Sequence, residues 1–266
     1  MPELPDVEGF RRVFAEHAAG RTVERVEVLD RSMLRNRRPQ ALGRLLAGQR
    51  LRDPRRHGKW VFVPVGDGWL LLHFGMTGLL EWCPRGSERH AHDRLIVVSD
   101  HGELRYRNMR KLGGVWIARD DAERDRVTGP LGPDARGLAR ERFDELIASR
   151  RGGIKAALMD QRLIAGLGNL MSDEVLWRAR VNPRAACRSL SPRRRRALHD
   201  AVRATVRESI PAGRVPHGPK WLTAVRDRPD ARCPRCGATL VKATVAGRTA
   251  CWCRRCQRRS SSPTSG

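Results

Sequence analysis

The sequence has no long apolar run. No segment approaches the roughly 20 consecutive apolar residues of a transmembrane helix. The N-terminus also lacks the apolar stretch of a secretory signal peptide. These absences argue against a secreted or membrane-spanning protein, so we expect a cytosolic protein with no membrane partner.

Acidic residues and lysine are scarce as well. The chain has 53 Lys and Arg residues against 29 Asp and Glu, and the formal net charge of +24 predicts a polyanionic partner such as nucleic acid. Only five of the basic residues are lysines, a bias that GC-rich codon usage can also produce. Each lysine is therefore more informative, because a lysine can exchange a proton whereas arginine stays charged.

The cysteines do not suggest a disulfide framework, because their number is odd and four of the seven form two close pairs. Cys233-Pro-Arg-Cys236 and Cys253-Arg-Arg-Cys256 are Cys-x2-Cys knuckles, a pattern typical of tetrahedral thiolate coordination of zinc. We expect one structural Zn²⁺ per chain at Cys233, Cys236, Cys253 and Cys256. The remaining cysteines, which we expect not to bind metal, are Cys83, Cys187 and Cys251.

The first half of the chain predicts one helix followed by antiparallel strands. Apolar residues recur at helical spacing from about residue 6 to 19. Short apolar or alternating segments then predict strands, and glycine-containing turns between neighbours favour hairpins packed as a β-sandwich. The predicted strands cover residues 23–29, 60–65, 69–74, 95–98, 103–106 and 115–118.

The second half predicts helices and then a short metal-binding segment. The strongest helix has Ser191 as N-cap and Pro192 at its first position. The predicted helices cover residues 140–148, 154–160, 170–179 and 193–210. The predicted organisation is an N-terminal domain (1–125), a linker (126–137), a helical domain (138–227), a zinc ribbon (228–260) and a flexible tail (261–266).

Two motifs in the second half suit contact with phosphate. Ala246-Gly247-Arg248 would place Arg248 at the tip of the ribbon hairpin among other basic residues, including Arg258 and Arg259, although a tip arginine is often only solvated. Gly166-Leu167-Gly168-Asn169 precedes a helix whose first amides can bind an anion, and Lys155 could add a charge there. A plain helix connection remains the alternative for that turn.

The N-terminus, Met1-Pro2-Glu3-Leu4-Pro5, allows two interpretations. Removal of the initiator methionine would leave a secondary amine on Pro2, and a chain-terminal amine is far less protonated at pH 7 than a lysine. Such an amine can attack the anomeric carbon of a sugar and form an iminium, with Glu3 as a proton donor. The alternative is an extended lead-in that caps the first helix.

Taken together, these motifs resemble the formamidopyrimidine-DNA glycosylase and endonuclease VIII family of bifunctional repair enzymes. The resemblance spans nearly the whole chain. The matching segments are residues 2–5, 55–59, 73–78, 165–169, 172–174, 247–249 and 256–257.

The resemblance implies a multidomain α+β fold with an N-terminal β-sandwich flanked by helices, a helix-two-turn-helix domain and a zinc β-ribbon. It implies a bacterial monomer associated with the nucleoid, acting on duplex DNA that contains a damaged base or an abasic site. Pro2 would attack C1′, Glu3 would protonate or orient the sugar oxygen, and Lys59 would contact phosphate and assist elimination. Arg248 would act with Asn169 on the backbone beside the lesion. The other implied DNA-binding residues are His73, Met76, Arg110, Leu112, Lys155 and Glu174, of which Met76, Arg110 and Leu112 would enter the gap left by the everted base.

The chain departs from the family pattern at several positions. Asp6 replaces a glutamate, Asn108-Met109 replaces Asp-Pro, and Leu112 replaces a phenylalanine. The segment 211–232 lacks elements of the oxidised-purine branch, so the preferred lesion and the extent of elimination stay open. Two other functions also stay open: a catalytically silent protein that binds damaged DNA, and a zinc-ribbon protein of the RNA machinery.

Overall fold

The computed structural model describes residues 2–258 and divides the chain into two compact units, residues 1–130 and 131–266. Arg259 and the predicted tail (261–266) lie outside the described residues. Within residues 2–258, no helix combines the length and the apolar character that a membrane span requires.

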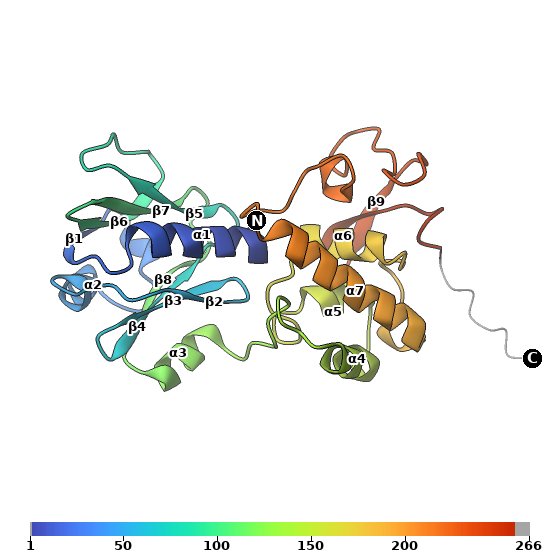
Figure 1. Ribbon diagram of the computed structural model, residues 1–266, viewed down its shortest axis with the longest axis horizontal. Coiled ribbons are helices and arrows are strands. Elements are labelled where there is room, and N and C mark those ends of the chain that lie inside the picture. The colour runs from blue at the N-terminus through green and yellow to red at the C-terminus, as the bar shows by residue number, and fades with distance from the viewer. Residues whose placement is uncertain (1, 259–266) are drawn as a thin grey trace, which may run out of the picture. The chain divides into compact units, whose positions relative to one another are not determined.

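Two four-stranded antiparallel sheets form the first unit (Figure 1). One sheet has the order β1 (Val23–Val28), β6 (Asp93–Ser99), β7 (Gly102–Asn108) and β5 (Gly78–Cys83). The other has the order β2 (Arg55–His57), β3 (Trp60–Val65), β4 (Gly68–His73) and β8 (Gly114–Ala118). Apolar side chains of both sheets meet in one core, which confirms the predicted sandwich.

Helix α1 (Leu4–His17) contacts β5 and β7 of one sheet and β2 and β3 of the other. Its buried residues Val7 and Phe14 belong to the core that the sheets share. The helix therefore holds the N-terminal residues against the sandwich. The other helices of this unit are η1 (Arg31–Met33), α2 (Pro39–Leu46) and α3 (Asp121–Thr128).

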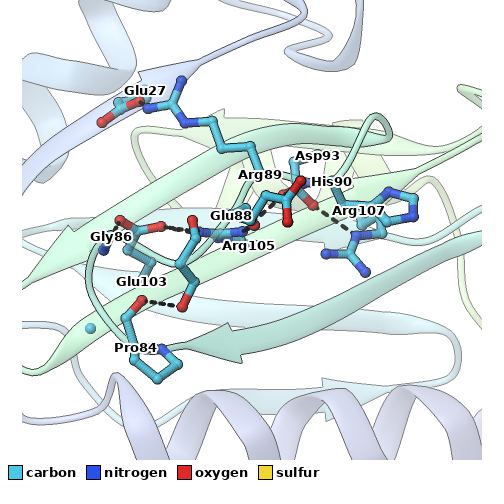
Figure 2. A network of polar contacts seen from close by, with 12 residues as sticks. Glu27, Pro84, Gly86, Glu88, Arg89, His90, Asp93, Glu103, Arg105 and Arg107 are labelled. Carbon is cyan, nitrogen blue, oxygen red and sulfur yellow. Dashed lines mark hydrogen bonds and ion pairs between the residues drawn. The ribbon is translucent and has the colours of Figure 1, made fainter.

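A buried arginine fixes the long connection between β5 and β6 (Figure 2). The Arg105 guanidinium donates to the carbonyl oxygens of Ser87 and Glu88, each at 2.7 Å. It also pairs with Glu103 at 2.6 Å and Asp93 at 3.3 Å. Since buried charges are tolerated only when they are paired and hydrogen-bonded, this network is a structural anchor for the loop.

The second unit contains the predicted helices and the cysteine-rich ribbon. Its helices are α4 (Arg140–Ser149), α5 (Ile154–Met159), α6 (Asn169–Arg178), η2 (Cys187–Ser189), α7 (Pro192–Ser209) and η3 (Leu222–Ala224). Ser191 caps α7 by accepting from Arg194 N at 3.4 Å, as predicted. Strands β9 (Val241–Val245) and β10 (Arg248–Trp252) form the ribbon hairpin, and β10 contacts α6.

The apolar residues of the ribbon share a hydrophobic core with the helices of the second unit. Trp177 of α6 and Leu222 of η3 pack in one buried cluster with residues of the ribbon, so the helices support the hairpin. The ribbon residues of this cluster are Ala231, Cys233, Leu240, Cys251 and Cys253. This arrangement follows from the shortness of the segment, which offers too few apolar residues to stabilise itself.

Candidate functional site

The N-terminal residues are held by a capped helix start. Glu3 is the N-cap of α1 and is fully buried, and its backbone N–H donates to Asp6 Oδ2 at 2.9 Å as part of a reciprocal capping box. Pro2 directly precedes this helix start, and Glu3, not Pro2, supplies the cap. The capping role and the nucleophilic role are therefore compatible.

Asp6 is a titratable group close to the N-terminus. Burial is the largest influence on its carboxyl, and although the hydrogen bond from the Glu3 backbone opposes it, the pKa of Asp6 is raised to about 6. A carboxyl in this environment changes its charge close to neutral pH, whereas an ordinary aspartate does not.

Lys59 lies in the turn between β2 and β3, and this turn is tied to α1 by a buried ion pair. Arg56 Nε donates to Glu8 Oε2 at 3.0 Å, and Arg56 Nη1 donates to the carbonyl oxygen of Gly58 at 3.0 Å. The exposed fractions of the Arg56 and Glu8 side chains are 4% and 3%. The structure thus connects the helix that carries Pro2 and Glu3 with the turn that carries Lys59.

His73 ends β4 opposite Trp60, with 4.8 Å between the ring centroids. Burial, with a smaller contribution from the Lys59 charge, lowers the pKa of His73 to about 4, so the imidazole is neutral at pH 7. Its Nδ1 accepts from Gly75 N at 3.3 Å, which leaves the ring proton on Nε2. His73 can therefore donate a hydrogen bond but does not supply a positive charge.

Met76, Arg110 and Leu112 lie on two loops that pack against each other. Thr77 Oγ1 accepts from Arg110 N at 2.9 Å, which joins the turn after β4 to the loop after β7. Gly75 has φ +58°, and a Cβ there would lie 1.8 Å from the Leu112 carbonyl oxygen, so only glycine permits this contact. The structure brings these three predicted residues into one region of the first unit.

In the second unit, Asn169 is joined to the ribbon hairpin. Asn169 is the first residue of α6, and its Nδ2 donates to the Thr249 carbonyl oxygen at 3.0 Å. Ala246 and Gly247 have φ +53° and +70°, the signature of a two-residue hairpin turn. Arg248 follows this turn as the exposed first residue of β10, so it does not form the tip itself.

Lys155 does not present its charge at the surface, in contrast to the expectation that it would add to a phosphate-binding surface. It is fully buried and pairs with Asp173, and its Nζ lies 3.4 Å from the Thr249 carbonyl oxygen. Asp173 also accepts from Cys251 N and from Arg226, each at 3.0 Å. Lys155 is therefore placed to fix the ribbon hairpin rather than to touch a ligand.

Glu174 is also buried, and its contacts are with the chain itself. Its Oε2 accepts from Leu222 N at 2.8 Å, and its Oε1 accepts from Arg178 Nε at 2.8 Å. The carboxylate thus anchors η3, which lies in the segment 211–232. Sequence reasoning missed this anchoring and the roles of Glu8, Arg56, Asp173 and Arg226, because only burial and partners distinguish them from other charged residues.

The four paired cysteines form a potential metal site. The Sγ atoms of Cys233, Cys236, Cys253 and Cys256 all lie within 4.8 Å of one another. Gln257 supports the second knuckle, because its Oε1 accepts from Cys253 N at 2.9 Å and its Nε2 donates to the Val181 carbonyl oxygen at 2.8 Å. Cys83, Cys187 and Cys251 are not members of this cluster.

Comparisons with known proteins agree with the resemblance. The formamidopyrimidine-DNA glycosylase N-terminal domain matches residues 1–115, and the H2TH domain of the same enzymes matches residues 131–217. A formamidopyrimidine-DNA glycosylase of Roseiflexus sp. (strain RS-1) is 35% identical over 97% of this chain and 100% of its own length. One from Stenotrophomonas maltophilia (strain K279a) is 34% identical with the same coverage of both chains.

Solved structures show the same similarity. Wild-type Fpg (MutM) of Lactococcus lactis, in complex with DNA that contains N7-benzyl-Fapy-dG, superposes with a TM-score of 0.87 and 28% identity over 97% of this chain and 100% of that chain. The same enzyme with DNA that contains an oxidised pyrimidine gives a TM-score of 0.88 at the same identity and coverage. On this evidence, the chain belongs to the formamidopyrimidine-DNA glycosylase family.

Proposed function

We propose that the protein is a bifunctional DNA glycosylase and abasic-site lyase that excises damaged bases from duplex DNA as a monomer, with Pro2 as its nucleophile. The observation that carries this proposal is the N-terminus itself. Pro2 precedes a buried, capped helix start, Glu3 is buried beside it, and the Glu8–Arg56 ion pair ties this helix to the turn that carries Lys59. Its place of action would be the bacterial nucleoid.

In the proposed reaction, which requires that Met1 has been removed, the secondary amine of Pro2 forms a bond to C1′ as the bond from C1′ to the damaged base breaks. The base leaves with the electron pair of that bond and with the proton that the amine gives up. Glu3 protonates or orients the ring oxygen as the sugar opens, and the nitrogen lone pair then forms the iminium. The iminium acidifies C2′, so loss of a C2′ proton expels the 3′ phosphate. Lys59 would hold the neighbouring phosphate and assist this elimination.

The remaining predicted residues would bind the DNA around this chemistry. His73 would donate from its neutral ring, and Asn169 and Arg248 would hold the backbone beside the lesion. Met76, Arg110 and Leu112 would occupy the gap left by the everted nucleotide. Lys155 and Glu174 would act indirectly, since both are buried in contacts that fix β10 and η3.

Membership of the family does not determine which damaged base the protein prefers. The Lactococcus lactis enzyme has the same fold in complexes with a Fapy-dG derivative and with an oxidised pyrimidine. A cleavage panel of duplexes with 8-oxoguanine, formamidopyrimidine, thymine glycol, dihydrouracil and an abasic site would assign the lesion class.

The cysteine cluster would hold one structural zinc ion. Four sulfurs at about 2.3 Å from a tetrahedral zinc lie about 3.8 Å from one another. The Sγ pairs Cys233–Cys256, Cys236–Cys253 and Cys236–Cys256 are 3.9, 3.6 and 3.5 Å apart, which fits that geometry. The ion would stabilise the ribbon and so hold Arg248 in place.

Borohydride reduction tests the nucleophile. The wild-type protein, incubated with an abasic duplex and borohydride, should give a covalent complex whose peptide map places the DNA on Pro2. Pro2→Gly should lose most of the trapped product and of the strand cleavage, while it still binds the duplex. A wild-type protein that binds the abasic duplex tightly but neither nicks nor traps it would instead identify a catalytically silent binding protein.

A further inference from the structure

Exposed apolar side chains concentrate on the loop between β7 and β8. Among the described residues, the large apolar side chains with high exposure are Met109, Leu29 and Leu112, at 53%, 44% and 43%. A single exposed apolar residue is ordinary. Two of these three, however, lie within four residues of each other on the segment 108–113, here called the wedge loop.

The wedge loop is held from the inside by Asn108. The Asn108 side chain is buried, its Nδ2 donates to the Leu112 carbonyl oxygen at 2.7 Å, and its Oδ1 accepts from Thr77 Oγ1 at 3.1 Å. Its backbone is fixed as well, because Asn108 N donates to the His92 carbonyl oxygen and Arg94 Nε donates to the Asn108 carbonyl oxygen, each at 2.9 Å. The loop therefore begins at a rigid point.

Arg35 and Asp30 hold the other side of the wedge loop. Arg35 donates to the carbonyl oxygens of Lys111 and Gly113 at 2.7 and 2.6 Å. Lys111 has φ +54°, and its Nζ lies 2.8 Å from Asp30 Oδ2. With its backbone fixed on both sides, the loop presents Met109 and Leu112 to solvent without needing to be ordered by a ligand.

We propose that Met109 is an additional wedge residue, which contacts the bases next to the gap left by the everted nucleotide. This inference rests on the proposed function. Rigidly presented apolar side chains, including methionine, insert between base steps and unstack them, and methionine adapts its shape to irregular gaps. Arg110 beside it is exposed as well and is proposed to enter the same gap, so Met109 lies next to a residue of the proposed DNA contact.

The proposal makes Met109 a specificity residue, because its contact forms only where the stack is open. Contact with intact, stacked bases would bury little of the side chain. Removal of the side chain should therefore weaken binding to damaged DNA more than binding to intact DNA, and it should not alter the number of phosphates contacted.

The test compares Met109→Ala with Leu29→Ala, which removes an apolar side chain of similar exposure elsewhere in the same unit. Dissociation constants are measured for an intact duplex and for the same duplex with a tetrahydrofuran abasic analogue. We expect Met109→Ala to lower the preference for the abasic duplex by about tenfold, which is the scale of losing the burial of one apolar side chain. Leu29→Ala and the conservative Met109→Leu should keep the wild-type preference, and thermal midpoints should be unchanged.

A 2-aminopurine opposite the abasic position gives a second readout. Its fluorescence should rise on binding of wild-type protein and rise less with Met109→Ala. A Met109→Ala variant with the wild-type preference and fluorescence change would overturn the proposal, and so would equal weakening on both duplexes. A wild-type protein without any preference for the abasic duplex would contradict the proposed function itself.

Discussion

Arg56 Nε lies 3.0 Å from Glu8 Oε2, and both side chains are almost completely buried. The same guanidinium donates to the Gly58 carbonyl oxygen, so one arginine links α1 to the turn before β3. Lys59 follows Gly58, and Pro2 and Glu3 precede α1. This ion pair therefore adds to the core packing that places the proposed nucleophile relative to the proposed phosphate-binding lysine, and we propose Arg56 and Glu8 as positioning residues.

We expect Glu8→Gln to destabilise the protein by about 3 kcal/mol or more, because it removes a buried carboxylate charge that faces the buried Arg56 guanidinium. The nicking rate on an abasic duplex should fall at saturating DNA, since the turn with Lys59 loses its attachment. Denaturant unfolding and single-turnover kinetics measure the two effects.

Glu24→Gln is the matched control for Glu8→Gln. Glu24 pairs with Arg85 at 2.8 Å, but the exposed fractions of these side chains are 39% and 47%. An exposed pair contributes about 1 kcal/mol or less, so this variant should keep its stability and its activity. Equal effects of the two substitutions would contradict the role given to the buried pair.

Asp6 gives a prediction about pH. Its pKa is raised from 3.8 to about 6 in the folded protein, mainly by burial. A raised carboxyl pKa means that the folded state favours the protonated form, so the associated stability is present below pH 4 and is lost as pH rises through 6. Relative to Asp6→Asn, which keeps an acceptor but does not titrate, the wild type should lose about 2 to 3 kcal/mol of unfolding free energy between pH 4 and pH 7.

Parallel denaturant titrations of the wild type and Asp6→Asn at several pH values measure this difference. The comparison isolates Asp6 from His73, whose lowered pKa has the opposite effect in a similar pH range. A constant difference between the two proteins from pH 4 to pH 7 would show that the Asp6 carboxyl is not perturbed.

Most strands and helices with regular apolar spacing were predicted from the sequence, but α2 (Pro39–Leu46) and β5 (Gly78–Cys83) were missed. Residues 60–65 were predicted as a strand and form β3 with the same bounds, because an apolar run between turn residues has few alternatives. Strand β2 (Arg55–His57) was missed, since its three residues are basic and it forms only by pairing with β3. Helix α3 was missed because it has almost no apolar face, and Asp120 caps it by accepting from Glu123 N at 2.7 Å.

In the candidate site, too, the sequence identified some residues and missed the roles of others. Residues next to glycine turns or knuckles, such as Asn169 and Cys236, could be singled out because the local pattern is chemically specific. The burial of Lys155 could not be predicted, because its partner Asp173 is 18 positions away and Thr249 is 94 positions away along the chain. Tertiary contacts between charged residues leave no periodic signal in the sequence.

The cysteine cluster predicts a metal-dependent ribbon. Cys253→Ser removes one of four sulfurs, and we expect the purified variant to contain less than one zinc per chain and to lose near-ultraviolet circular dichroism from the tryptophans packed there. The binding energy of structural zinc, about 10 to 16 kcal/mol, exceeds what so small a segment gains from packing. Cys83→Ser, which changes a cysteine outside the cluster, should retain its zinc and its spectrum. A zinc-free Cys253→Ser protein with an unchanged spectrum would contradict a structural role for the metal.

Lys155 and Arg248 should respond differently to removal of their charges, although both are basic residues near Thr249. Each phosphate contact contributes about 0.9 to the slope of log affinity against log salt concentration, so six contacts would give a slope of about −5. Arg248 is exposed, so Arg248→Ala should reduce the magnitude of the slope by about 1 and leave the unfolding free energy unchanged.

Lys155 is buried against Asp173, so Lys155→Met should lower stability by about 3 kcal/mol, because it leaves Asp173 with one cation fewer. Its salt slope should stay close to that of the wild type under conditions in which the variant is folded. Salt titrations of DNA binding, paired with denaturant unfolding of both variants, measure these quantities. The reverse pattern, with a smaller slope for Lys155→Met and destabilisation for Arg248→Ala, would mean that Lys155 reaches phosphate and that Arg248 supports the hairpin.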